Sequence, residues 1–114
     1  MEPIPEDRFG EFVDDALDLI PEPLWQAIDN VAIVIEDQHP DDPDLLGLYE
    51  GIPLTERGDY FGVLPDRIAI YRLPLCAFVA DSDELVEEVA ITVVHEIAHH
   101  YGIDDAKLHE WGWG

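Results

Sequence analysis

The sequence predicts a single domain of the α+β class, in which an N-terminal helix and a long C-terminal helix flank a group of strands. Two observations indicate this order. Residues 7–20 and 85–101 carry apolar side chains at helical spacing, whereas residues 31–37, 45–51 and 67–73 are rich in β-branched residues or alternate in polarity. A chain of 114 residues, 47% of them hydrophobic, can build one hydrophobic core but not two, so residues 1–114 are expected to form one domain.

The N-terminal helix is predicted over residues 7–20. Its apolar side chains recur every three or four positions and acidic residues occupy the opposite side, which is typical of a helix packed against a core. Pro21 and Pro23 end the pattern, because a proline inside a helix removes a backbone hydrogen bond. A short helical piece is expected at residues 24–29.

Three strands are predicted in the middle of the chain. Residues 31–37 are continuously apolar, which favours a central strand buried on both faces. Residues 38–44 are polar and contain two prolines, so we expect a loop before a second strand at 45–51. A long irregular connection at 52–65 leads to a third strand at 67–73, which Pro74 is expected to end.

A long helix is predicted over residues 85–101, with Asp81 or Ser82 as the N-terminal cap. Gly102 follows, where a helix can end in a left-handed turn. Most of the helix circumference is apolar, so a narrow polar sector should face a cleft or a ligand. That sector holds Glu88, Thr92, His95, Glu96 and His99.

The polar sector contains the pattern H-E-x-x-H. His95 and His99 are four residues apart, which places their imidazoles one helical turn apart on one face, where both can bind one metal ion. Glu96 is then placed to act as general base. After the reversal at Gly102, Asp105 can bring a carboxylate to the same ion. Three protein ligands leave a fourth position open, as in catalytic zinc sites.

The stretch TVVHEIAHHYGIDD, together with YEGIPLTERG and LPDRIAIYR, resembles the zincin metallopeptidases, and among them small bacterial single-domain proteins with a minimal zincin-like fold. The resemblance implies an N-terminal backing helix, a small mixed sheet of three to four strands and a C-terminal active-site helix. It also implies zinc-dependent peptide hydrolysis with His95, His99 and Asp105 as Zn²⁺ ligands and Glu96 as base. Larger zincins pair substrate with a sheet edge, for which residues 45–51 are the candidate here. They also carry a Met-containing turn, whereas Met1 is the only methionine of this chain.

Several neighbouring residues have alternative roles. Asp104 or His109 could replace Asp105 as the third ligand, and His100 is expected beside the core or behind the ligands. Tyrosines near the motif are either packed aromatics or donors to a developing oxyanion; the three considered are Tyr49, Tyr71 and Tyr101.

The charge of the chain restricts its partners. Twenty-seven acidic residues against five Lys and Arg give a net charge of −22, which repels nucleic acids and anionic membranes. A basic partner, or a peptide substrate with basic residues, fits this surface. The alternative to a peptidase is therefore a zinc-binding interaction module with an idle site that docks a basic protein. The lone Cys76 and the absence of an apolar leader predict a cytoplasmic protein.

Overall fold

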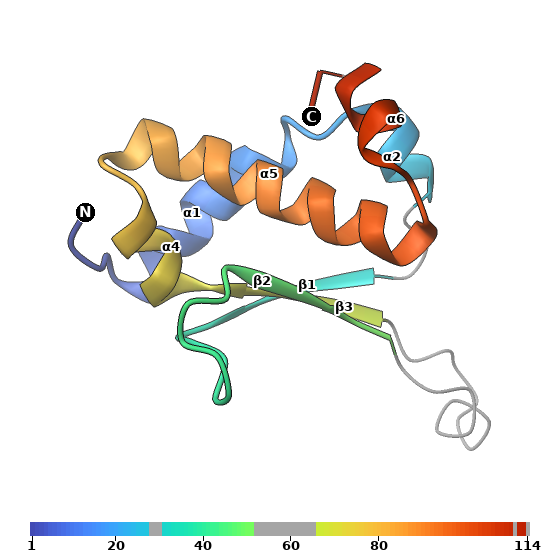
Figure 1. Cartoon of the computed structure of the whole chain (residues 1–114). Coiled ribbons are helices and arrows are strands. Elements are labelled where there is room, and N and C mark those ends of the chain that lie inside the picture. The colour runs from blue at the N-terminus through green and yellow to red at the C-terminus, as the bar shows by residue number, and fades with distance from the viewer. Residues whose placement is uncertain (28–30, 52–65, 111, 114) are drawn as a thin grey trace.

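The computed structural model describes residues 1–27, 31–51, 66–110 and 112–113, with backbone alone at positions 25, 27, 101 and 105. The predicted connection at 52–65 therefore lies outside the described residues. The α+β order expected from the sequence is confirmed (Figure 1). The elements are α1 (Glu6–Leu17), α2 (Glu22–Ala27), β1 (Val31–Glu36), β2 (Gly47–Glu50), β3 (Asp66–Tyr71), α4 (Arg72–Phe78), α5 (Ser82–Tyr101) and α6 (Asp105–Glu110).

The described strands form a mixed sheet in the order β1-β3-β2, in agreement with the predicted small mixed sheet. β3 runs parallel to β1 and antiparallel to β2. The prediction that residues 31–37 form the central strand is wrong, because β1 lies at one edge of this sheet and is only half-buried along its length. The centre belongs to β3, whose last four residues, Ile68 to Tyr71, are buried. An apolar run predicts burial, but it cannot tell which strand has two neighbours.

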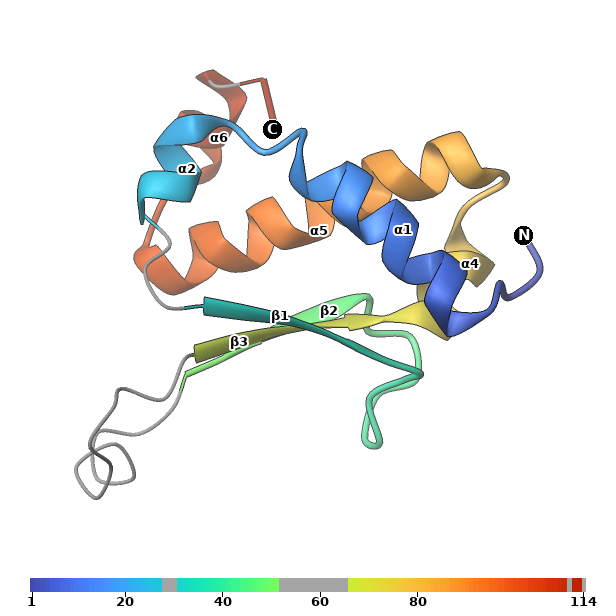
Figure 2. The ribbon, with the colours of Figure 1, turned by 180° about the vertical axis from the view of Figure 1, so that it is seen from behind.

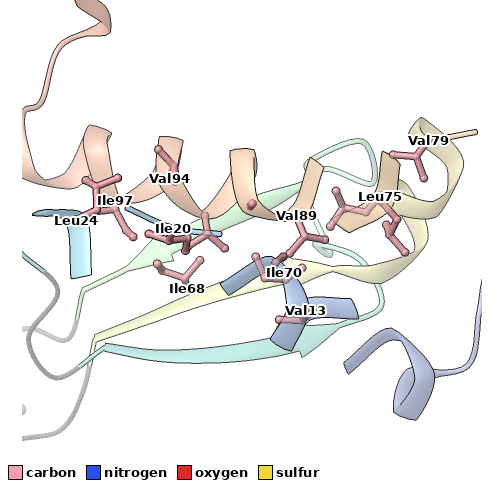
Figure 3. Close-up of a cluster of buried hydrophobic side chains, with 14 of the residues drawn as sticks. Val13, Ile20, Leu24, Ile68, Ile70, Leu75, Val79, Val89, Val94 and Ile97 are labelled. Carbon is pink, nitrogen blue, oxygen red and sulfur yellow. The ribbon is translucent and has the colours of Figure 1, made fainter. Parts of the chain in front are cut away.

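The helices α1 and α5 cover one face of the sheet, as the views from front and back both show (Figures 1 and 2). Between them lies the hydrophobic core. Phe9 and Val13 of α1 meet Val89 and Val93 of α5 there, and all four are buried. Figure 3 shows Ile68 and Ile70 of β3 pointing into the same cluster. Burial of this apolar area is the main driving force that holds α5 against the sheet.

The helix α4 was not anticipated, since Pro74 was expected only to end the third strand. Instead the chain turns directly from β3 into a helix that begins at Arg72. Pro74 occupies the third helical position, where the N–H that proline lacks would have had no partner within the helix. Leu75 and Cys76 are buried on the inner side of α4.

The ends of α5 follow local rules read from the sequence. The Asp81 carboxylate caps the first turn by accepting a 2.9 Å hydrogen bond from the backbone N–H of Glu84. At the other end Gly102 adopts the left-handed conformation, with φ 69°, as predicted. The segment that follows forms the helix α6, whose Leu108 side chain is buried. None of the described helices has the length and apolar character needed to cross a membrane.

Candidate metal centre

His95 and His99 lie one turn apart on α5, as the H-E-x-x-H spacing requires. Their ring centroids are 6.4 Å apart and the ring planes are tilted by 55°. The His99 side chain is 71% exposed, whereas His95 is half-buried. Two imidazoles presented in this way on the open side of a rigid helix are suitable donors for zinc.

Glu96 points toward the strand β2. Its Oε1 accepts a 3.0 Å hydrogen bond from the backbone N–H of Tyr49, and its Oε2 lies 3.7 Å from Nδ1 of His99. The side chain is only 19% exposed. The carboxylate therefore stands between the histidine pair and the edge of the sheet, where a general base can reach a group held at either side.

A glycine lets α5 approach β2 closely enough for this contact. A Cβ atom placed on Gly47 would lie 2.6 Å from Cγ2 of Thr92 and 3.1 Å from the carbonyl oxygen of Ala69. Both distances are too short for an ordinary contact, so a side chain at position 47 would push the helix and strand apart. Thr92 and Glu96 are four residues apart on α5, so the same close approach brings Glu96 within hydrogen-bonding distance of Tyr49.

The turn at Gly102 leads to the two candidate aspartates. Asp104 is the N-terminal cap of α6, because its Oδ1 accepts a 2.8 Å hydrogen bond from the backbone N–H of Lys107. Asp105 is the first residue of α6, and its side chain lies outside the described part of the structure. His109 is exposed on the same helix.

A cavity of about 310 Å³ adjoins His95. Its walls are largely apolar and come from the end of the α1 region, from α5 and from the segment after α6. The lining residues are Leu19, Glu87, Ala90, Ile91, His95, Gly112 and Trp113. The backbone carbonyl oxygen of Trp113 lies 3.3 Å from Nε2 of His95, so this segment covers one side of the histidine. The cavity therefore opens beside one of the two candidate histidine ligands.

Glu88, in the polar sector of α5, does not join the His95–Glu96 group. Burial raises the pKa of its carboxyl, repulsion from Glu84 adds to the increase, and His95 opposes it. Glu88 is half-buried without a counter-charge strong enough to offset its desolvation. The folded protein therefore disfavours the charged form of this carboxyl.

Sequence reasoning did not identify Asp66 as a residue near the site. The phenol O–H of Tyr49 donates a 2.8 Å hydrogen bond to Asp66 Oδ2, and the Tyr49 ring stacks on His100. The sequence held one indication of this cluster. His100 follows Glu96 by four residues and therefore projects from the same side of α5, toward Tyr49 and Asp66. His100 thus faces β2, where it stacks on Tyr49 and lies 4.0 Å from Asp66.

The donor set is appropriate for zinc, because two imidazoles and nearby carboxylates are the N and O ligands that this ion takes. Among the residues whose side chains are described, no three histidine, cysteine or acidic groups converge on one point. The predicted third ligand, Asp105, falls outside that set.

Comparison with known proteins identifies the family to which this chain belongs. Residues 28–113 match the family described as zincin-like metallopeptidases, so the chain belongs to this family. A solved structure of a conserved hypothetical protein from Thermo thermophilus has the same fold, with a TM-score of 0.54 and 24% sequence identity over 86% of this chain and 94% of that chain. That protein's description assigns it no activity. A search of the curated proteins gave no match.

Proposed function

We propose that the protein is a zinc-dependent peptidase, with His95, His99 and Asp105 as metal ligands and Glu96 as the general base. The observation that carries this proposal is the position of Glu96. In a chain of the zincin-like metallopeptidase family, its carboxylate stands 3.7 Å from a candidate ligand on one side and is hydrogen-bonded to an edge strand on the other.

The chain's own groups account for the proton transfers of peptide hydrolysis. Zinc, when bound, supplies a Lewis acid that acidifies water and stabilises negative charge on the carbonyl oxygen. The Glu96 carboxylate accepts the proton from the water that attacks the peptide carbonyl. It then donates this proton to the leaving amine as the C–N bond breaks. The hydrogen bond from the Tyr49 N–H to Glu96 Oε1 holds the carboxylate between these two transfers.

The local geometry supports β2 as the place where substrate binds. β2 is an edge of the described sheet, and Glu96 lies at that edge. An extended peptide added to an edge strand is held by main-chain hydrogen bonds and presents alternate side chains to either face. One of these side chains would enter the cavity beside His95.

The cavity and the charge together define the substrate class. Apolar walls from Leu19, Ile91 and Trp113 favour a large apolar side chain next to the cleaved bond. The net charge of −22 favours basic residues elsewhere in the peptide, since these are attracted to the surface as a whole. We place the enzyme in the cytoplasm, where the buried Cys76 thiol stays reduced.

The proposal is tested by metal analysis together with digestion of a peptide library. We expect one equivalent of zinc per chain in both the wild type and Glu96→Gln, and cleavage by the wild type alone. A chain that takes up no zinc after reconstitution at neutral pH would refute the proposal. Zinc binding without cleavage of any peptide, combined with recovery of a basic protein by Glu96→Gln in a pull-down, would favour the interaction module.

A further inference from the structure

A second side-chain stripe on α5, distinct from the histidine pair, faces β2. It consists of Thr92, Glu96 and His100, which are spaced four residues apart and so project from one side of the helix. Thr92 lies against Gly47, Glu96 accepts the Tyr49 N–H, and His100 stacks on the Tyr49 ring. The helix and the strand thus meet at three successive points, and Tyr49 takes part in two of them.

The N–H of Tyr49 is not part of the sheet ladder. The backbone N–H of Tyr71 donates to the carbonyl oxygen of Leu46, and these two residues lie directly opposite each other in the β2–β3 register. Hydrogen-bonded and non-hydrogen-bonded pairs alternate in an antiparallel ladder. Tyr49, opposite Ile68, is therefore in a non-hydrogen-bonded pair, and its N–H points away from β3 to the outer edge, where Glu96 receives it.

The Tyr49 side chain is fixed from two directions. Its ring and that of His100 are stacked, with centroids 3.8 Å apart and planes 14° from parallel. Its O–H donates to Asp66 Oδ2 at 2.8 Å, and the same oxygen lies 4.0 Å from Nε2 of His100. Asp66 begins β3 and His100 belongs to the last turn of α5, so the tyrosine is held by both elements between which it lies.

We infer that Tyr49 is a positioning residue for Glu96. Its amide fixes one carboxylate oxygen, Oε1, and leaves Oε2 directed toward His99, while its clamped ring keeps that amide in place. A glutamate has three rotatable side-chain bonds, and a base that must find one rotamer during the reaction loses the advantage of preorganisation. This inference rests on the proposed function, in which Glu96 is the base.

Two substitutions at residue 49 distinguish the effect of its backbone amide from the effect of its side-chain ring. Tyr49→Ala and Tyr49→Pro both delete the ring, but only proline also deletes the N–H. Proline is tolerated on an edge strand where the N–H faces outward, so the β2–β3 ladder should persist in both variants. Leu48→Pro, which removes an N–H that faces β3, is the control that should lose the fold.

We expect kcat of Tyr49→Pro to fall on the order of 10- to 100-fold below that of Tyr49→Ala, because a misplaced catalytic group costs about this much. KM and zinc content should be the same in the two variants. Equal kcat values for Tyr49→Pro and Tyr49→Ala would overturn the inference. If Tyr49→Pro does not fold, the backbone amide of residue 49 can be replaced by an ester, which removes the same N–H and retains the ring. The kcat of the ester protein should then fall by the same factor below that of the wild type, and an equal kcat would overturn the inference.

A second measurement does not depend on activity. In the zinc-loaded wild type the Tyr49 amide proton should be protected from hydrogen exchange, and Glu96→Ala should abolish that protection while the Leu48 amide keeps its own. Rapid exchange at Tyr49 in the wild type would overturn the inference even if peptide is cleaved. A protected Tyr49 amide in a protein that cleaves no peptide would refute the proposed function and, with it, the positioning role, and would leave only the structural contact.

Discussion

Gly47 and Thr92 are in such close contact that the helix and the strand leave no space for a methyl group between them. A Cβ at position 47 would lie 2.6 Å from Cγ2 of Thr92. This contact sets the distance between α5 and β2, and the position of Glu96 depends on that distance.

Gly47→Ala should therefore lower the free energy of unfolding by about 1–3 kcal/mol, the usual cost of overpacking a close contact. It should also lower kcat, because the shift moves Glu96 away from Tyr49. Thr92→Ser removes Cγ2 and should restore part of both losses in the double variant. Denaturant unfolding and steady-state kinetics on the two single variants and the double variant measure the coupling. Additive effects would mean that the two residues do not set the spacing.

The two aspartates after Gly102 should have different roles: Asp104 caps α6, and Asp105 binds zinc. Asp104→Ala should lower stability by about 1 kcal/mol, through loss of the hydrogen bond to Lys107 N–H, and leave zinc affinity unchanged. Asp105→Ala should weaken zinc binding and leave the unfolding of the metal-free protein nearly unchanged. Calorimetric zinc titration and thermal unfolding with a chelator distinguish the two. His109→Ala is the control, and a loss of zinc affinity there would move the third ligand from Asp105 to His109.

Filling the cavity beside His95 should change which peptides are cleaved. Ile91→Trp places a larger side chain in a wall of the 310 Å³ space, so KM should rise most for substrates with large apolar residues next to the cleaved bond. A hydrophobic pocket usually changes kcat/KM by about 10- to 200-fold between two substrates that differ by one methylene group. Phe78→Ala, an exposed apolar residue on α4, is the matched control. Unchanged preferences in a library digest of Ile91→Trp would exclude the cavity as a subsite.

The elevated pKa of Glu88 predicts a stability that depends on pH. A carboxyl whose pKa is higher in the folded state than in the unfolded chain favours folding at low pH, and that contribution is lost as pH rises through its folded pKa. Glu88→Gln removes the buried charge and should raise Tm at pH 7. The gain should shrink as pH falls through the raised pKa of the folded state and be lost below about 4.3, where the carboxyl is protonated in the unfolded chain as well. Thermal unfolding of both proteins across this range, with the exposed Glu87→Gln as control, measures the effect.

Local rules in the sequence predicted the ends of α5 correctly, because Asp81 and Gly102 act on backbone groups within a few residues. The H-E-x-x-H spacing likewise placed His95 and His99 on one face, since helical geometry alone determines it. Both features can therefore be predicted from a short stretch of sequence, without the tertiary structure.

Features that depend on tertiary packing could not be predicted in the same way. The edge position of β1 depends on how distant strands pair, and the helix α4 depends on Leu75 and Cys76 finding space in the core. The contact between Tyr49 and Glu96 joins residues 47 positions apart, and only the register of β2 directs that N–H outward. The role of Asp105 stays a prediction.

The histidine pair and Glu96 stand on a single helix, whereas Leu19, Gly112 and Trp113, which enclose the neighbouring cavity, come from separate segments. One helix thus fixes the spacing of these three side chains, and it also supplies part of the cavity wall through Ala90 and Ile91. In the proposed peptidase, a substitution at Leu19 should therefore change which peptide side chain is accepted, while the helix keeps His95, Glu96 and His99 at the same spacing.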